Sequence, residues 1–177
     1  MKRYAKLVFS IIVLSISFTL LYTNFSNDRW ERGFKVQSII DSQKEVAVMR
    51  SAYAQEQERN HDMQLLARAV NGEARGEPYI GQVAVAAVIL NRVQHPSFPN
   101  TIAGVIYQPR AFTAVADGQI NAPIAEDTTV YKACEDAMNG WDPSGGAIYY
   151  YNPEKTTSEW IYTREVIKTI GKHVFAQ

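Results

Sequence analysis

The order of apolar and polar positions along the 177-residue chain separates three parts. Residues 1–25 begin with a basic cluster, which is followed by an uncharged and mostly apolar run from Leu7 to Tyr22. This order is typical of a secretory signal or a membrane anchor. The run is slightly shorter than the ~20 residues that cross a bilayer, and no small-residue cleavage motif directly follows it. We predict an uncleaved N-terminal hydrophobic helix, whose basic flank stays inside while the rest of the chain crosses the membrane.

Residues 26–59 are polar and contain no proline. Their few apolar positions fit no long helical stripe, and residues 55–60 have no apolar side chain at all. We interpret this second part as a polar tether, partly helical, between the anchor and a domain. Residues 60–177 form the third part, which is long enough to bury a single core.

The third part opens with helical periodicity. Apolar residues at positions 63, 66, 67 and 70 predict a helix that starts near residue 60 or 62 and ends at residues 71–72. A second helix is predicted to begin after Pro78 and to end before His95, and it is apolar on nearly every side, so we expect it at the buried centre of the domain. A short helical turn at residues 102–106 and a third helix from about residue 127 to residue 140 follow.

The C-terminal region has the composition of strands. Aromatic and β-branched residues predict short strands at 147–151, 160–162 and 173–175, with a short helical piece at about 165–170. Alternation along the first strand predicts that at least one ring of the three consecutive tyrosines at 149–151 is buried and at least one is exposed. Because helices precede a small mixed region, the fold class is predicted to be α+β.

Charge and cysteine content exclude several kinds of site. Eighteen Lys and Arg residues balance eighteen Asp and Glu residues, which argues against general nucleic-acid binding. Cys134 is the single cysteine, so the chain has no internal disulfide and no four-cysteine zinc site, and its place on an apolar helix face predicts an inert core thiol. The three histidines match no metal-ligand spacing, and we predict neither a metal nor a cofactor.

The segment from residue 71 to residue 78 carries the most unusual chemistry. Two carboxylates, Glu73 and Glu77, flank Arg75 between two apolar helices. Glu77 fits either a helix cap, stabilised by the positive helix start, or a substrate contact. Glu73 is expected just past the negative end of the first helix and against the apolar second one, where both effects disfavour its charged form, as a general acid requires. Arg75 either pairs with Glu73 or contacts substrate or structure.

Larger blocks of sequence carry a resemblance. These blocks are Leu65–Pro78, Gly81–Val93, Phe98–Thr101, Gln108–Val115, Asn139–Pro143, Ala147–Pro153 and Ile170–Phe175. In this order they resemble the SleB/CwlJ family of bacterial cell-wall hydrolases, the spore cortex-lytic enzymes. The resemblance implies a lysozyme-like α+β catalytic domain that acts on the glycan strands of peptidoglycan. It also implies that Glu73 is the catalytic acid and that the products carry the anhydro ends of a lytic transglycosylase.

The carboxylates outside this segment bear on the mechanism. Ordinary glycoside hydrolysis uses two carboxylates, but Asp117, Glu126 and Asp127 lie in or near loops, where we interpret them as surface residues and Asp117 as a turn former. A single acid suits a transglycosylase, in which the 6-hydroxyl of the sugar replaces water, while a hydrolase remains the alternative. The predicted substrate-binding residues are Arg75, Glu77, Gln108, Phe112, Thr113, Tyr149, Tyr151, Asn152 and Trp160.

Together these observations predict an exported wall-cleaving enzyme, anchored rather than released, at the outer face of the cytoplasmic membrane or in the cell wall. Its partners are expected to be peptidoglycan strands and, through residues 1–25, the membrane, while a protein regulator is left open. The alternative is a cell-wall-binding or scaffold module without catalytic activity. Spore cortex and vegetative wall, and roles in sporulation, germination or wall turnover, are equally open at this point.

Overall fold

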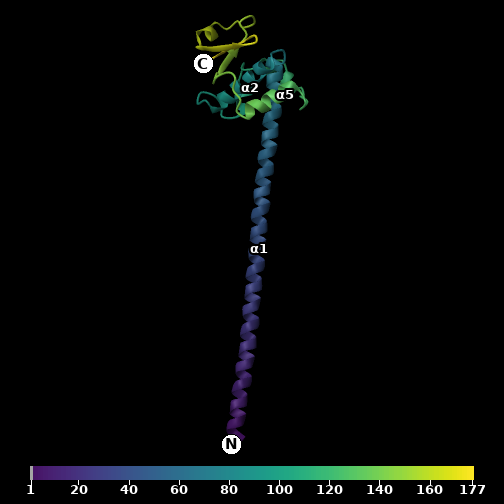
Figure 1. Cartoon of the computed structure of the whole chain (residues 1–177), viewed down its shortest axis with the longest axis vertical. Helices are drawn as coiled ribbons and strands as arrows, with labels where there is room; N and C mark the ends of the chain where they lie inside the picture. Colours follow the sequence, from purple (N-terminus) through teal and green to yellow (C-terminus); the bar gives the residue numbers. More distant parts are fainter. Residues whose placement is uncertain (1) are drawn as a thin grey trace. The chain divides into compact units, whose positions relative to one another are not determined.

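The computed structural model describes the backbone of residues 2–177 and the side chains of residues 14–27 and 29–177. The chain divides into two compact units between Gln55 and Glu56, and the description below takes each unit by itself. Figure 1 follows the order of the elements along the chain. The first element, helix α1 (Lys2–Ala74), includes all described residues of the first unit and enters the second.

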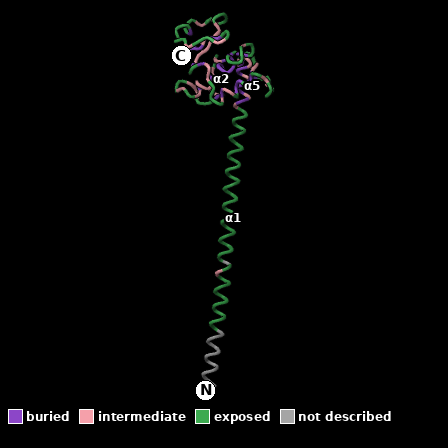
Figure 2. Tube along the Cα trace, in the orientation of Figure 1, coloured by how far each residue is buried: buried purple, intermediate pink, exposed green. Residues whose placement is uncertain are grey.

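The described residues of the first unit are all helical, and their described side chains are nearly all exposed (Figure 2). The predicted partly helical tether at 26–59 is therefore a complete helix, and the helix expected to start near residue 60 starts far upstream. The reason is that the polar tether contains no proline and only one glycine, Gly33, so nothing interrupts helical hydrogen bonding.

Much of the predicted hydrophobic segment lies outside the described side chains, which begin at residue 14. In the part of the chain that could be searched, no helix combines the length and the apolar character that crossing a membrane requires. Membrane anchoring of residues 1–25 stays a prediction.

The second unit is built around helix α2 (Tyr79–Gln94). Every residue of α2 from Gly81 to Ile89 is buried, which confirms the prediction that this apolar helix is the centre of the domain (Figure 2). Helix α2 packs against α5 (Thr129–Met138), whose first turn is capped where the Thr128 hydroxyl accepts a hydrogen bond from the Tyr131 N–H at 3.2 Å. Shorter helical pieces connect them: α3 (Ile102–Ile106), α4 (Thr113–Ala116) and the 3₁₀ turn η1 (Gln119–Asn121).

A three-stranded antiparallel sheet follows, with β3 (His173–Ala176) between β1 (Tyr149–Tyr151) and β2 (Val166–Ile170). The predictions for two short segments are wrong. Residues 160–162, predicted as a strand, lie in a 3₁₀ helix, η2 (Glu159–Thr163), and residues 166–170, predicted as helical, form strand β2. Residues 166–170 become a strand because they pair with β3, and a segment of five residues is too short for its periodicity to specify helix or strand.

The three tyrosines of β1 also differ from the prediction. All three are half-buried, instead of one buried and one exposed ring. Tyr150 packs on the hydrophobic core, where its ring lies edge to face with His173 at a centroid distance of 5.3 Å and is tilted against Phe175 at 6.3 Å. β1 lies at the edge of the sheet and pairs only with β3, and each of its three residues stays partly exposed. Helices followed by a small antiparallel sheet confirm the predicted α+β class.

Candidate active site

The last turn of α1 presents Glu73 beside the first turn of α4. Glu73 is the residue before the end of α1, so it lies within the helix and not just past it as predicted. Its Oε1 atom accepts a hydrogen bond from the backbone N–H of Ala114 at 3.1 Å. Gly72 makes this approach possible, because a Cβ at that position would collide with the Cβ of Ala114. The glycine next to the acid therefore sets the distance between the acid and the loop that holds it.

Two more polar side chains face Glu73. The phenol of Tyr150 lies beside the Glu73 carboxyl, and burial together with the negative charge of Glu73 raises the pKa of Tyr150 well above its ordinary value. Arg92 is the third member of this group; it is buried, and its guanidinium lies over three aromatic rings, those of Phe98, Phe112 and Tyr149. A phenol that stays protonated and a buried cation thus flank the carboxyl.

The guanidinium of Arg92 has its own fixed partners. Its Nε–H donates to the backbone oxygen of Ile148 at 2.7 Å, which ties α2 to the start of β1. Burial lowers the pKa of Arg92, while the nearby Tyr150, Tyr149 and Glu73 oppose that shift. The guanidinium of arginine keeps its charge in proteins, so Arg92 adds a positive charge near Glu73.

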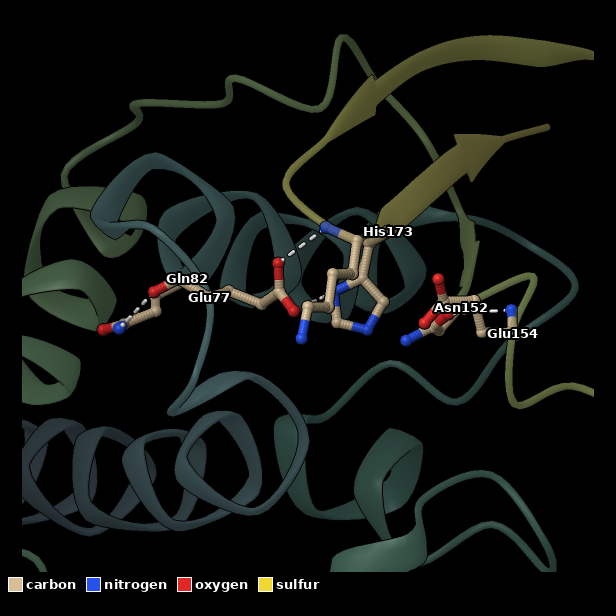
Figure 3. Close-up of polar contacts among 6 residues, drawn as sticks. Glu77, Gln82, Asn152, Glu154 and His173 are labelled. Carbon is tan, nitrogen blue, oxygen red and sulfur yellow. Dashed lines mark hydrogen bonds and ion pairs between the residues drawn. The ribbon is translucent and has the colours of Figure 1, made fainter.

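Glu77 holds the β2–β3 hairpin to the segment that follows α1 (Figure 3). Its Oε2 atom accepts a hydrogen bond from the backbone N–H of Lys172 at 2.8 Å, and its Oε1 atom lies 3.9 Å from Nδ1 of His173. Pro78 is the N-cap of α2 and no side chain caps that helix, so the helix-cap interpretation of Glu77 is wrong. Burial lowers the pKa of His173, Glu77 opposes this and Lys155 adds to it.

These residues line a cleft of about 640 Å³. Six predicted site residues lie along it: Glu73, Arg75, Glu77, Thr113, Tyr151 and Asn152. Asn152 also shapes its own loop, because its Oδ1 atom accepts the N–H of Glu154 at 2.9 Å (Figure 3). The lining of the cleft comes from five parts of the sequence, at residues 72–77, 92, 111–113, 150–156 and 172–173.

Four predicted substrate-binding residues do not line this cleft: Gln108, Phe112, Tyr149 and Trp160. Phe112 is only 3 % exposed and packs in the core, so the expected glycan contact is corrected to core packing. Tyr149 and Trp160 instead stack edge to face at 5.4 Å beneath the guanidinium of Arg164. Gln108 is half-buried and closes a turn, where its backbone oxygen accepts the N–H of Ala111 at 3.1 Å.

The predicted set left out several residues that line the cleft: Arg92, Tyr150, Lys155, Thr156, Lys172 and His173. One signal was available for Arg92, since it is the only charged residue on the apolar helix α2. No local signal distinguished Lys155 or Lys172 from ordinary loop residues, because their proximity depends on how the hairpin folds back.

In the part of the chain that it describes, the structure offers neither a metal site nor a second free acid in the cleft. Among these described residues, no group of three or more His, Cys, Asp or Glu side chains could hold a metal ion. Cys134 is buried in the core, and burial raises the pKa of its thiol. Asp117, Glu126 and Asp127 are exposed and lie outside the cleft, and Asp117 forms the predicted turn by accepting the N–H of Gln119 at 3.0 Å.

Residues 76–176 match the Cell Wall Hydrolase family. The chain belongs to this family. Among its relatives is a spore cortex-lytic enzyme of Bacillus cereus, which is 64% identical over 117 residues, covering 66% of this chain and 44% of that protein. The spore cortex-lytic enzyme of Bacillus subtilis is 61% identical over 118 residues, or 67% of this chain and 38% of the relative. The cell wall hydrolase CwlJ of Bacillus subtilis is 28% identical over 123 residues, which cover 66% of this chain and 84% of CwlJ.

Two solved structures of such relatives have the same fold. The catalytic domain of the Bacillus cereus SleB protein matches with a TM-score of 0.63 and 64% identity, covering 67% of this chain and 91% of that one. The catalytic domain of the germination-specific lytic transglycosylase SleB of Bacillus anthracis matches with a TM-score of 0.63 and 65% identity. The match covers 66% of this chain and 93% of that one. This chain spans about 44% of the length of the first cortex-lytic relatives.

Proposed function

We propose that this chain cleaves the glycan strands of peptidoglycan as a lytic transglycosylase, with Glu73 as its one catalytic acid and base. The observation that carries the proposal is the placement of Glu73 in the cleft, held by the Ala114 N–H and facing Tyr150. The name of the Bacillus anthracis relative, a lytic transglycosylase with 65% identity, supports the reaction type.

The arrangement suits proton transfer to a sugar. Glu73, when protonated, gives its proton to the glycosidic oxygen as the bond from that oxygen to the anomeric carbon breaks. The 6-hydroxyl oxygen of the same sugar then attacks the anomeric carbon, and its proton passes to the Glu73 carboxylate. The product is a 1,6-anhydro sugar, and the acid returns to its starting state without water taking part. The contacts from Ala114 and Tyr150 orient the carboxyl for both transfers.

The second carboxylate of the cleft supports a mechanism with a single acid. Glu77 is bound through Oε2 to the Lys172 amide, and its Oε1 faces His173. A hydrolase needs a second carboxylate free to activate water or attack the sugar. Because Glu77 holds the hairpin instead, the cleft offers Glu73 alone for chemistry.

The relatives and the N-terminal sequence support a proposal for the cellular setting. The names of the two cortex-lytic relatives support spore cortex as the substrate, and the name of the germination-specific Bacillus anthracis relative supports germination as the process in which the chain acts. The basic cluster and the apolar run within residues 1–25 support export and attachment to the outer face of the cytoplasmic membrane. We therefore propose a membrane-attached enzyme whose domain reaches the wall.

The experiment compares the full chain with Glu73→Gln, which keeps the shape of the side chain and removes its proton. The wild-type chain should release soluble muropeptides from decoated spores or sacculi, and Glu73→Gln should lose about a hundredfold or more of this activity. Glu154→Gln, an exposed acid outside the cleft, is the matched control and should stay at wild-type activity.

Mass spectrometry of the products separates the alternatives. Anhydro-muramic ends support the transglycosylase, and reducing ends indicate a hydrolase. Full activity in Glu73→Gln would contradict the assignment of the acid. Tight binding to sacculi without release of any fragment would indicate a wall-binding module instead of an enzyme.

A further inference from the structure

The cleft has a charge opposite to that of the domain around it. Residues 56–177 contain ten Lys and Arg residues against fourteen Asp and Glu residues, a net charge of −4. The lining of the cleft contains four cations, Arg75, Arg92, Lys155 and Lys172, against two carboxylates, Glu73 and Glu77. A positive cleft in a negative domain concentrates anions at that one place, because the rest of the surface repels them.

Three of the four cations have no ion-pair partner among the residues that the structure describes. Arg92 is buried, donates a hydrogen bond to the Ile148 oxygen and interacts electrostatically with Glu73. The side chains of Arg75, Lys155 and Lys172 are exposed and form no ion pair with any residue that the structure describes. We call these three residues the cationic rim. Their charges are available to a ligand.

The cationic rim is held in place by three separate loops. Arg75 directly follows the end of α1, two residues after Glu73. The backbone N–H of Lys155 donates to the Asn152 oxygen at 3.0 Å, and the backbone N–H of Lys172 donates to Glu77 at 2.8 Å. Each lysine therefore extends from a fixed backbone position toward the same cleft, although 17 positions separate them in sequence.

The uncharged sugars of a glycan do not require such a set of cations. The charged groups of a peptidoglycan strand are carried by its peptide stems, whose free carboxylates hang from the sugars next to each glycosidic bond. We propose that the cationic rim binds stem-peptide carboxylates and thereby selects glycan strands that still carry their stems. This inference rests on the proposed function for the identity of the polymer, and it assigns Arg75, Lys155 and Lys172 to substrate selection rather than to chemistry.

The test measures binding and not catalysis, so its outcome does not depend on the reaction. The full chain carrying Glu73→Gln is titrated with labelled, soluble glycan strands that either keep their peptide stems or have been stripped of them by an amidase. Stem-bearing strands should bind more tightly. Adding Lys155→Gln and Lys172→Gln should weaken their binding by roughly two- to fivefold per lysine and leave the binding of stripped strands unchanged. Raising the salt concentration should reduce the same preference.

Matched variants make the result specific to the cleft. Lys132→Gln removes an exposed cation from α5, outside the cleft, and should keep the preference, while Lys155→Arg with Lys172→Arg should restore it. Equal binding of both kinds of strand by Glu73→Gln would overturn the inference, as would an unchanged preference after loss of both lysines. Tighter binding of isolated teichoic acid than of stem-bearing strands would also overturn it, because the ligand would then be a phosphate polymer. A wild-type chain that prefers stem-bearing strands but releases no anhydro product would contradict the proposed function alone.

Discussion

The Oε2 atom of Glu77 accepts the backbone N–H of Lys172 at 2.8 Å, across 95 positions of sequence. This bond joins the segment after α1 to the turn between β2 and β3. The residue before Lys172 is Gly171, whose φ of 59° is in the left-handed region, and a Cβ there would collide with the same Oε2 atom. One carboxylate and one glycine therefore together hold the hairpin against the cleft.

Replacing Gly171 tests this connection. Gly171→Ala should lower the free energy of unfolding by about 2–4 kcal/mol, because it adds the cost of a positive φ to a collision with Glu77. Glu77→Ala should cost about 1–3 kcal/mol through the lost bond to a charged acceptor. The double variant should lose less than the two single losses added together, since removing the carboxylate removes the collision with Glu77 and leaves the one with Cδ of Pro78. Urea denaturation of all three variants measures this.

The matched control is Gly118→Ala. Gly118 has a φ of 82°, but nothing lies within 4 Å of the position that its Cβ would take. Gly118→Ala should therefore lose stability only through the strain of a positive φ. Its loss in the free energy of unfolding should add fully to that of Glu77→Ala in the double variant. Full additivity of Gly171→Ala with Glu77→Ala would contradict the joint role described above.

Replacing Gly72 tests how Glu73 is positioned. The new Cβ of Gly72→Ala meets Ala114, so α4 must shift and the bond from the Ala114 N–H to Glu73 must lengthen. We expect a loss of about 1–3 kcal/mol in stability and roughly a ten- to hundredfold fall in kcat for muropeptide release. Steady-state kinetics on sacculi, with urea denaturation in parallel, separate the two effects.

Gly76 offers a comparison within the same loop. Nothing lies within 4 Å of a Cβ at Gly76, so Gly76→Ala should leave the free energy of unfolding within about 0.5 kcal/mol of wild type. A Gly72→Ala variant with wild-type kcat would mean that the Ala114 contact does not position the acid.

The buried His173 predicts a pH dependence of stability. Burial lowers its pKa from the ordinary 6.5, so the unfolded chain takes up a proton below pH 6.5 while the folded domain does not. Stability should therefore fall as the pH decreases from 6.5 toward the lowered pKa and be constant above 6.5. The facing groups are Glu77, which favours the protonated ring, and Lys155, which disfavours it.

His173→Gln should remove this dependence. The difference in urea midpoint between pH 7.5 and pH 5.5 should be smaller in the variant than in wild type, because no group at position 173 then titrates. His95→Gln, which replaces a half-buried histidine away from the cleft, should keep the wild-type difference. An equal pH difference in wild type and His173→Gln would contradict the role of this ring.

Long apolar patterns predicted the helices of the domain well. The bounds of α2 and α5 follow from periodicity, from Pro78 before α2 and from Thr128 as the cap of α5. The acidic segment with Glu73 also stands out in the sequence, and the structure places it in the cleft. The short segments at 160–162 and 166–170 were predicted in the wrong states, because fewer than six residues carry too little local preference to outweigh strand pairing.

By itself the sequence determined the family, the buried helix α2 and the identity of the candidate acid, because each depends on residues that are close together along the chain. Only the tertiary structure decided that Glu77 holds a hairpin, that Arg92 and Tyr150 face Glu73, and that Phe112 belongs to the core. The balanced charge of the whole chain likewise concealed a negative domain with a positive cleft. Long-range contacts and the charge of the cleft depend on how segments that are distant in sequence pack together. A local sequence pattern contains no information about that packing.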